Sequence, residues 1–150
     1  MAKSIHKSIL VHGDVASLYR IWANFENFPH FMKHIKHIRR TGDRLSHWEM
    51  ASPLGRNLEW DAQTTAMEEN IRIAWQSTGG DIETGGEVRF EQQSDDQAKV
   101  TVSMHYTPPE GLTFEIAQWL LREPEDRLME DLKNFKKYAE SKAQAPRKAA

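Results

Sequence analysis

The predicted fold of this chain follows from the segment Leu112–Ser141, LTFEIAQWLLREPEDRLMEDLKNFKKYAES. At 100° per residue its apolar side chains fall on one narrow stripe, the pattern of a helix that buries one face. The stripe consists of Phe114, Ala117, Leu121, Leu128, Leu132, Phe135 and Ala139. A helix of this length spans on the order of 40 Å, so only a whole sheet is large enough to cover it.

The two halves of this stretch differ. Ile116, Trp119 and Leu120 make the first half apolar nearly all round, so that half needs a second apolar neighbour besides the sheet. Pro124 lies between the halves and is expected to kink or restart the helix, because proline removes a backbone donor and clashes with the preceding turn. We therefore predict a sheet wrapped around this helix, with space under its first half.

Length and composition predict one domain. The chain has 150 residues, enough for a single core, and we expect one domain over residues 1–141. Residues 142–150 lack apolar periodicity and carry Pro146, which predicts a flexible tail. The formal charge of -2 argues against a generic nucleic-acid binder, so we expect no DNA partner.

The absence of cysteine excludes disulfides, thiol nucleophiles and cysteine metal sites. No run approaches the length of a membrane span, and the first residues lack the apolar core of a signal peptide. The expected location is the cytoplasm, and the expected oligomeric state is a monomer or a homodimer.

The chain before the long helix predicts one strand, two short helices and six more strands. Ile5, Ile9 and Val11 mark the first strand, and Asp14 is placed to cap a helix over Val15–Ala23. A second short helix is expected around Pro29, with the proline in its first turn. The later strands are predicted at Lys36–Thr41, Leu45–Met50, Leu58–Met67, Ile71–Ser77, Gly86–Gln92 and Lys99–Tyr106.

Short connections between these strands predict an antiparallel meander. Apolar residues alternate with polar ones along each strand, so one face of the sheet should be wet and the other should face the long helix. The residues assigned to the inner face are Trp48, Met50, Leu58, Trp60, Ala62, Ile71, Ile73, Trp75, Val88, Phe90, Val100, Val102, Met104 and Tyr106. The glycine pairs Gly79-Gly80 and Gly85-Gly86 are interpreted as hairpin turns.

Several residues and motifs follow one another along this order of elements: Val11, Tyr19-Arg20-Ile21-Trp22, Phe28-Pro29-His30-Phe31-Met32, Trp60, Ile73-Ala74-Trp75-Gln76-Ser77, Gly86-Glu87-Val88-Arg89-Phe90, Tyr106-Thr107-Pro108-Pro109 and Asp131-Leu132-Lys133-Asn134-Phe135-Lys136. Together with the order of elements, they resemble the START-like helix-grip superfamily (SRPBCC), specifically its polyketide cyclase/dehydrase and coenzyme Q-binding branch. The resemblance implies an α+β helix-grip fold: a curved seven-stranded antiparallel sheet around a long C-terminal helix, with two short helices between strands 1 and 2. It also implies a deep apolar cavity between sheet and helix.

The chain has five tryptophans and six methionines, and their large, adaptable side chains suit the wall of such a cavity. The predicted ligand-binding residues are Trp22, Phe31, Met32, Trp48, Met50, Trp60, Trp75, Phe90, Met104, Tyr106, Phe114 and Trp119. An apolar pocket with few polar groups is typical of small-molecule sites. We therefore expect binding of a hydrophobic small molecule that is aromatic, polyketide-like or isoprenoid and quinone-like.

Catalytic signals are weaker, and Tyr106 is the one ionisable group that the pattern places inside the cavity. A hydroxyl there could orient a carbonyl or a phenol, so a cyclase/dehydrase-type enzyme acting on an aromatic or poly-keto substrate is the alternative. Several converging polar groups would favour that enzyme over a carrier. His30, His34 and His37 have helical spacing, with His47 beyond them, but we expect no metal and no cofactor.

Two small basic clusters, His37-Ile38-Arg39-Arg40 and Lys133-Asn134-Phe135-Lys136-Lys137, raise a second alternative of another class. Relatives of the resembled fold include ribosome-associated proteins, so an interaction module that contacts RNA is possible. Acidic residues interrupt both clusters, and a solvated helix face explains the second one. An RNA or ribosome partner is therefore not the expected one.

Overall fold

The computed structural model describes residues 3–51, 57–107, 118 and 124–143, and the account below concerns these residues. The elements in chain order are β1 (Lys3–His12), α1 (Val15–Ala23), the 3₁₀ helix η1 (Phe25–His30), β2 (Ile35–Gly42), β3 (Leu45–Ala51), β4 (Asn57–Glu68), β5 (Arg72–Gly80), β6 (Glu83–Ser94), β7 (Gln97–Thr107) and α3 (Pro124–Ala143). The predicted order of strands and helices is confirmed.

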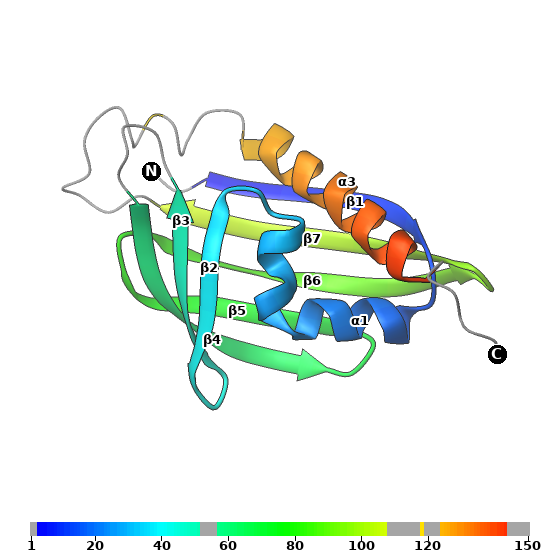
Figure 1. The fold of residues 1–150 in the computed structure, drawn as a ribbon, viewed down its shortest axis with the longest axis horizontal. Helices are drawn as coiled ribbons and strands as arrows, with labels where there is room; N and C mark the ends of the chain where they lie inside the picture. Colours follow the sequence, from blue (N-terminus) through cyan, green and yellow to red (C-terminus); the bar gives the residue numbers. More distant parts are fainter. Residues whose placement is uncertain (1–2, 52–56, 108–117, 119–123, 144–150) are drawn as a thin grey trace.

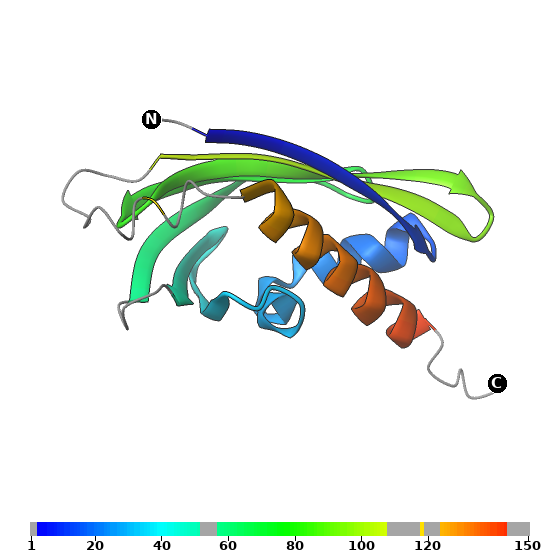
Figure 2. The same cartoon turned by 90° about the horizontal axis from the view of Figure 1, so that it is seen from above.

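The seven strands form one antiparallel sheet in the order β1-β7-β6-β5-β4-β3-β2. Strands β2 to β7 follow each other as a meander, and β1 closes the sheet beside β7 (Figure 1). Figure 2 shows that the sheet curves and that α3 and α1 lie on the same side of it, within the curve. This is the predicted arrangement of a sheet around the C-terminal helix.

The second half of the predicted apolar stripe is the buried face of α3. Leu128, Leu132, Phe135 and Ala139 are all at most 6% exposed. The ring centroid of Phe135 lies 4.9 Å from that of Trp22 on α1, so the helix packs on α1 as well as on β1. The first half of the stripe, with Phe114, lies outside the described residues. The described helix begins at Pro124, where a kink or restart was predicted, and ends at Ala143, two residues beyond the predicted end.

Local signals explain the two short helices. The Asp14 carboxylate accepts a 2.8 Å hydrogen bond from the Ser17 backbone N–H, which is the predicted cap of α1. The prediction that Pro29 starts the second helix is wrong. Asn24 caps that helix through the Glu26 N–H at 3.3 Å, so η1 begins at Phe25 and Pro29 is near its end.

The outer face of the sheet is wet, as predicted. Arg72 on β5 pairs with Glu87 on β6 at 3.0 Å and with Glu68 at 3.0 Å, and Arg89 pairs with Glu87 at 2.6 Å. One inner-face assignment is wrong, because Ile71 is 52% exposed. It lies in the turn before β5, where strand alternation does not yet apply.

The interpretation of the two glycine pairs as hairpin turns is also wrong. Gly79 and Gly80 end β5, and the pair Gly85-Gly86 lies within β6. A Cβ on Gly86 would collide with the Ser103 carbonyl of β7, and a Cβ on Gly80, whose φ is +122°, would collide with the Trp60 backbone. Glycine is required at these positions because neighbouring strands approach closely there.

Candidate functional site

A cavity of about 140 Å³ lies between the sheet, the two N-terminal helices and α3. All ten described elements or their adjoining loops contribute to its wall. The lining residues are Ile5, Trp22, Phe28, Met32, His34, Ile35, Trp48, Met50, Trp60, Trp75, Ile82, Thr84, Val102, Met104, Tyr106, Arg127, Leu128 and Asp131. Most of these side chains are apolar, so the cavity suits a hydrophobic molecule.

Aromatic rings form one part of the wall. Trp48 and Trp60 face each other across β3 and β4, and their rings stack with centroids 5.8 Å apart and planes 19° apart. Phe28 of η1 meets Trp48 edge-on at 5.4 Å and Trp22 of α1 at 5.4 Å. These contacts hold the rings in fixed orientations, so the wall is preorganised for a flat molecule.

The close approach of β5 to β4 positions Trp60. The backbone of Gly80 lies directly against that of Trp60, and no side chain could be inserted between them. The neighbouring Asp81 N–H donates a 2.7 Å hydrogen bond to the Glu59 carbonyl, and the Asp81 carboxylate accepts a 2.9 Å bond from the Glu59 N–H. These two hydrogen bonds hold β4, the strand that carries Trp60, against the loop that follows β5.

Polar groups gather where α3 approaches β7. The Arg127 guanidinium donates a 3.3 Å hydrogen bond from Nη2 to the Tyr106 hydroxyl. Burial raises the pKa of Tyr106, and the positive charge of Arg127 opposes that rise. Thr84 pairs with Tyr106 across β6 and β7, and its hydroxyl donates a 2.9 Å bond to the His105 carbonyl. A ligand in the cavity therefore meets a hydroxyl and a permanent cation in this wall.

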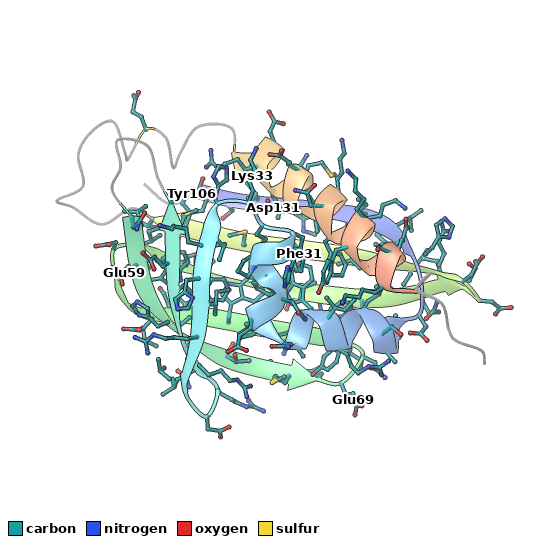
Figure 3. All side chains as sticks on the ribbon, in the orientation of Figure 1. Phe31, Lys33, Glu59, Glu69, Tyr106 and Asp131 are labelled. Carbon is teal, nitrogen blue, oxygen red and sulfur yellow. The ribbon has the colours of Figure 1, made fainter. Side chains whose placement is uncertain are left out.

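Asp131 lies one helical turn after Arg127, so both side chains project from the same side of α3 into the cavity wall. Figure 3 shows Asp131 and Tyr106 towards the end of the molecule where α3 begins. Burial raises the pKa of Asp131 to about 7, with a further rise from the charge of Glu130, while Arg127 and Lys33 act to lower it. Within the described ranges, no hydrogen bond reaches the Asp131 carboxyl.

His34 completes the polar part of the wall from the loop between η1 and β2. Its carbonyl accepts a 2.9 Å hydrogen bond from the Ala51 N–H, and the neighbouring Lys33 bridges to Glu130 of α3 at 3.1 Å. Burial lowers the pKa of His34, and the charges of Lys33 and Arg127 lower it further, which favours the neutral form of the imidazole. Neutral imidazole offers one N–H donor and one acceptor.

Eight of the twelve predicted ligand-binding residues line this cavity: Trp22, Met32, Trp48, Met50, Trp60, Trp75, Met104 and Tyr106. Phe31 and Phe90 do not. They pack in the core, where Phe31 lies 5.1 Å from the Phe135 ring and Phe90 lies 5.8 Å from the Tyr19 ring. Phe114 and Trp119 lie outside the described residues. Whether the eight lining residues bind a ligand stays a prediction.

The expectation that Tyr106 is the only ionisable group in the cavity is wrong, because His34, Arg127 and Asp131 also line it. Asp131 carried a signal in the sequence. It stands one helical turn before Phe135, on the flank of the apolar stripe of α3, where a carboxylate is unexpected. For His34, which lies in a loop, no periodic pattern indicated the direction of the side chain.

The histidines that share helical spacing do not converge. The His30 ring stacks on Tyr138 of α3 at 5.4 Å, whereas His34 lines the cavity. His47 lies on the outer face between Asp61 and Glu59, at 2.8 Å from each carboxylate. In the part of the chain that the structure describes, no three His, Asp or Glu side chains are arranged to hold a metal ion. Among the helices of that part, none is long and apolar enough to cross a membrane.

Comparison with known proteins yields one family and many structural neighbours. Residues 11–133 match the family described as polyketide cyclase/dehydrase and lipid transport. A 17.2 kDa uncharacterised protein of Streptomyces lincolnensis is 34% identical over 140 residues, which are 93% of this chain and 91% of that protein.

Among solved structures, the Zhui aromatase/cyclase from Streptomyces sp. R1128 has a TM-score of 0.82 at 12% identity, over 97% of this chain and 98% of that one. A START superfamily protein from Mycobacterium smegmatis has a TM-score of 0.73 at 14% identity, over 92% and 97%. At these identities the likeness is one of fold, and it confirms the predicted START-like helix-grip fold.

Proposed function

Because this chain belongs to the polyketide cyclase/dehydrase and lipid transport family, we propose that it binds a small hydrophobic molecule with an aromatic or quinone-like ring in the cavity between sheet and α3. The observation that carries this proposal is the preorganised aromatic wall, in which Trp48 stacks on Trp60 and Phe28 closes one side. Flat molecules bury most of their surface against such walls, and burial is worth ~25 cal/mol per Å².

The size of the cavity limits what enters it. Its volume of about 140 Å³ is close to the roughly 150 Å³ at which an engineered apolar cavity in another protein takes up benzene. The cavity therefore suits a single ring. A larger molecule, such as a polyketide chain or a prenylated quinone, would place one ring inside and the remainder beyond the described wall.

The affinity expected for such a ligand is moderate. A compound of about ten non-hydrogen atoms gains between roughly 0.3 and 1.5 kcal/mol per atom, from which the ordering costs are already subtracted. A dissociation constant on the order of 10 μM, or about -7 kcal/mol, lies within these bounds. Four described tryptophans line the cavity, so binding should quench tryptophan emission.

Two measurements test the proposal. Native mass spectrometry of freshly purified protein should detect a co-purifying apolar molecule, and titration with a short-chain benzoquinone or a phenol should quench tryptophan emission with saturation. Absence of saturable binding by both compounds at 100 μM would contradict the proposal. Phe90→Leu is the matched control, because Phe90 is a buried aromatic residue that does not line the cavity.

A cyclase/dehydrase-type enzyme acting on an aromatic or poly-keto substrate is the second candidate, and Asp131 is the observation that favours it. A carboxyl with a pKa of about 7 is well matched to general acid–base catalysis at neutral pH. In a dehydration, Asp131 would take a proton from the carbon beside a ketone and return it to the departing hydroxyl, so that a C=C bond forms and water leaves. Arg127 and Tyr106 would stabilise the enolate oxygen.

Turnover separates the two candidates. A β-hydroxy ketone of one ring should be dehydrated by the wild-type protein if it is an enzyme, and Asp131→Asn should retain binding while losing turnover. A carrier should bind this compound and return it unchanged. Product analysis by mass spectrometry after single-turnover mixing distinguishes these results.

A further inference from the structure

The polar groups of the cavity are not spread over its wall. Tyr106, Arg127 and Asp131 lie together where β7 meets α3, and His34 approaches from the η1–β2 loop. The stacked tryptophans come from β3 and β4, on the other part of the sheet. The cavity therefore has a ring-binding part and a polar part, and a ligand that satisfies both must itself have a ring and a polar group.

The polar part contains one permanent cation and one titratable carboxyl. The guanidinium of Arg127 donates a hydrogen bond to the Tyr106 hydroxyl. Asp131, one turn away, makes no ion pair with Arg127 and no hydrogen bond within the described ranges. Asp131 is partly buried and lines the cavity, so a ligand there can offer its carboxyl a hydrogen-bond partner.

Building on the proposed function, we infer that the ligand is an aromatic carboxylate whose ring lies against the tryptophans and whose carboxylate lies between Arg127, Tyr106 and Asp131, and that Asp131 takes up a proton on binding. The guanidinium and the phenol hydroxyl donate to the ligand oxygens. The protonated Asp131 carboxyl donates a further hydrogen bond to them. In this arrangement the ligand carboxylate is ionised and the adjacent Asp131 carboxyl is protonated, so two negative charges do not lie side by side.

The charges around Asp131 make this proton uptake the expected response. On α3 it is flanked by Glu130 and Arg127, from the η1–β2 loop Lys33 and His34 approach, and from β7 the neutral Tyr106 does. Lys33 is already paired with Glu130. A bound carboxylate adds negative charge beside Asp131, which raises the pKa of Asp131 further above about 7.

An amine ligand is the competing possibility, because aromatic rings beside a carboxylate can bind cations. The positive charge of Arg127, in the same part of the wall, would repel a bound ammonium group. The two kinds of ligand differ in the protonation state of Asp131 that their binding favours. A carboxylate ligand favours protonated Asp131 and binds more tightly at low pH, whereas an ammonium ligand favours ionised Asp131 and binds more tightly at high pH.

A matched series of one-ring compounds tests the inference on the full-length protein: 4-ethylbenzoate, the neutral 4-ethylbenzamide and 4-ethylbenzylamine. Affinity is measured by tryptophan quenching from pH 6 to 8.5. Proton uptake is measured by calorimetry in two buffers with different ionisation enthalpies. The benzoate stays ionised throughout, since carboxylic acids in water titrate near pH 4, so the pH dependence reports on the protein.

We expect the benzoate to bind at least tenfold more tightly than the amide at pH 6, and its affinity to fall by up to tenfold per unit above pH 7. Uptake should approach one proton per ligand at pH 8. Asp131→Asn should abolish the uptake and flatten the pH profile. Arg127→Gln should remove the preference for the acid, and Arg127→Lys should retain part of it. Lys133→Gln, at an exposed position on α3, should change neither the proton uptake nor the preference for the acid.

Equal binding of benzoate and amide, or tighter binding of the amine, would overturn this inference and leave the proposed function in place. Failure of all three compounds, together with the benzoquinone and the phenol, would overturn both. If Asp131→Asn does not fold, the proton count on the wild-type protein decides alone, because uptake near zero contradicts the inference.

Discussion

The guanidinium of Arg127, in the first turns of α3, donates a 3.3 Å hydrogen bond to the hydroxyl of Tyr106, on the last strand of the sheet. This contact joins helix and sheet at the cavity wall, which both side chains help to line. Its consequence is that a group added to the cavity meets two polar side chains whose relative positions are already fixed.

Tyr106→Phe removes one of these donors and retains the ring. A neutral hydrogen bond contributes about 1 kcal/mol, so affinity for a one-ring phenol or acid should fall by roughly fivefold. A carrier should lose no more than this. An enzyme that uses the hydroxyl should keep binding and lose most of its turnover. Tryptophan quenching and product analysis on the same preparation measure both effects.

Trp75→Leu should weaken ligand binding without unfolding the protein, because Trp75 is half-buried and lines the cavity. Phe90→Leu should lower stability and leave ligand binding unchanged. Phe90 is 4% exposed and packs against Tyr19 and Trp22, and it does not line the cavity. Its cost should appear in the free energy of unfolding, at ~1–2 kcal/mol. If Phe90→Leu weakened binding as much as Trp75→Leu, the cavity wall would be wrongly assigned.

Leu132→Ala should lower the free energy of unfolding by ~2–5 kcal/mol, the usual range for truncating a buried leucine. Leu132 is 1% exposed at the centre of the buried face of α3. Lys133→Ala, at the adjacent exposed position, should change stability by no more than about 0.5 kcal/mol. Urea denaturation followed by circular dichroism measures both variants. A loss below about 1 kcal/mol for Leu132→Ala is incompatible with the described packing.

Asp131→Asn should make the protein more stable at pH 8 and should have little effect near pH 4. The pKa of Asp131 is about 7 in the folded chain, against an ordinary value of 3.8, so the folded state binds this proton more tightly. The associated stability is therefore fully present below pH 3.8 and is lost as pH rises through 7. At 1.36 kcal/mol per unit, the loss in the wild-type protein is at most about 4 kcal/mol.

Unfolding in urea at pH 4, 6 and 8 measures this difference between variant and wild type. The matched control is Asp126→Asn, an exposed carboxylate in the first turn of the same helix. Its effect on the free energy of unfolding is measured under the same conditions. A stability difference for Asp131→Asn that is equal at all three pH values would show that Asp131 titrates as an ordinary carboxyl.

Gly86→Ala should destabilise the protein by ~1–3 kcal/mol, because the added methyl group collides with the Ser103 carbonyl and the Met104 backbone of the adjacent strand. Gly79→Ala provides the control, since no atom lies within 4 Å of a Cβ at that position. Thermal unfolding of the two variants measures the difference. Equal melting temperatures would contradict the close approach of β6 to β7.

Local sequence patterns were enough to predict the helices and strands and the faces that they bury. The 3.6-residue repeat of Leu128, Leu132, Phe135 and Ala139 specified the buried side of α3, and the two-residue alternation along the strands specified which side faces it. Asp14, as a capping residue, indicated where α1 begins. These features depend on neighbours a few residues apart, so local periodicity and capping chemistry were sufficient to predict them.

The set of side chains that line the cavity, and the pKa values of the polar ones, could not be predicted from local patterns. Phe31 and Trp22 are both buried aromatic residues, yet only Trp22 reaches the cavity, because that depends on elements far apart in the chain. The polar part of the wall combines Tyr106 of β7 with Arg127 and Asp131 of α3. The pKa of Asp131 follows from the loss of water around it, and desolvation arises only when helix, loop and sheet enclose the same space.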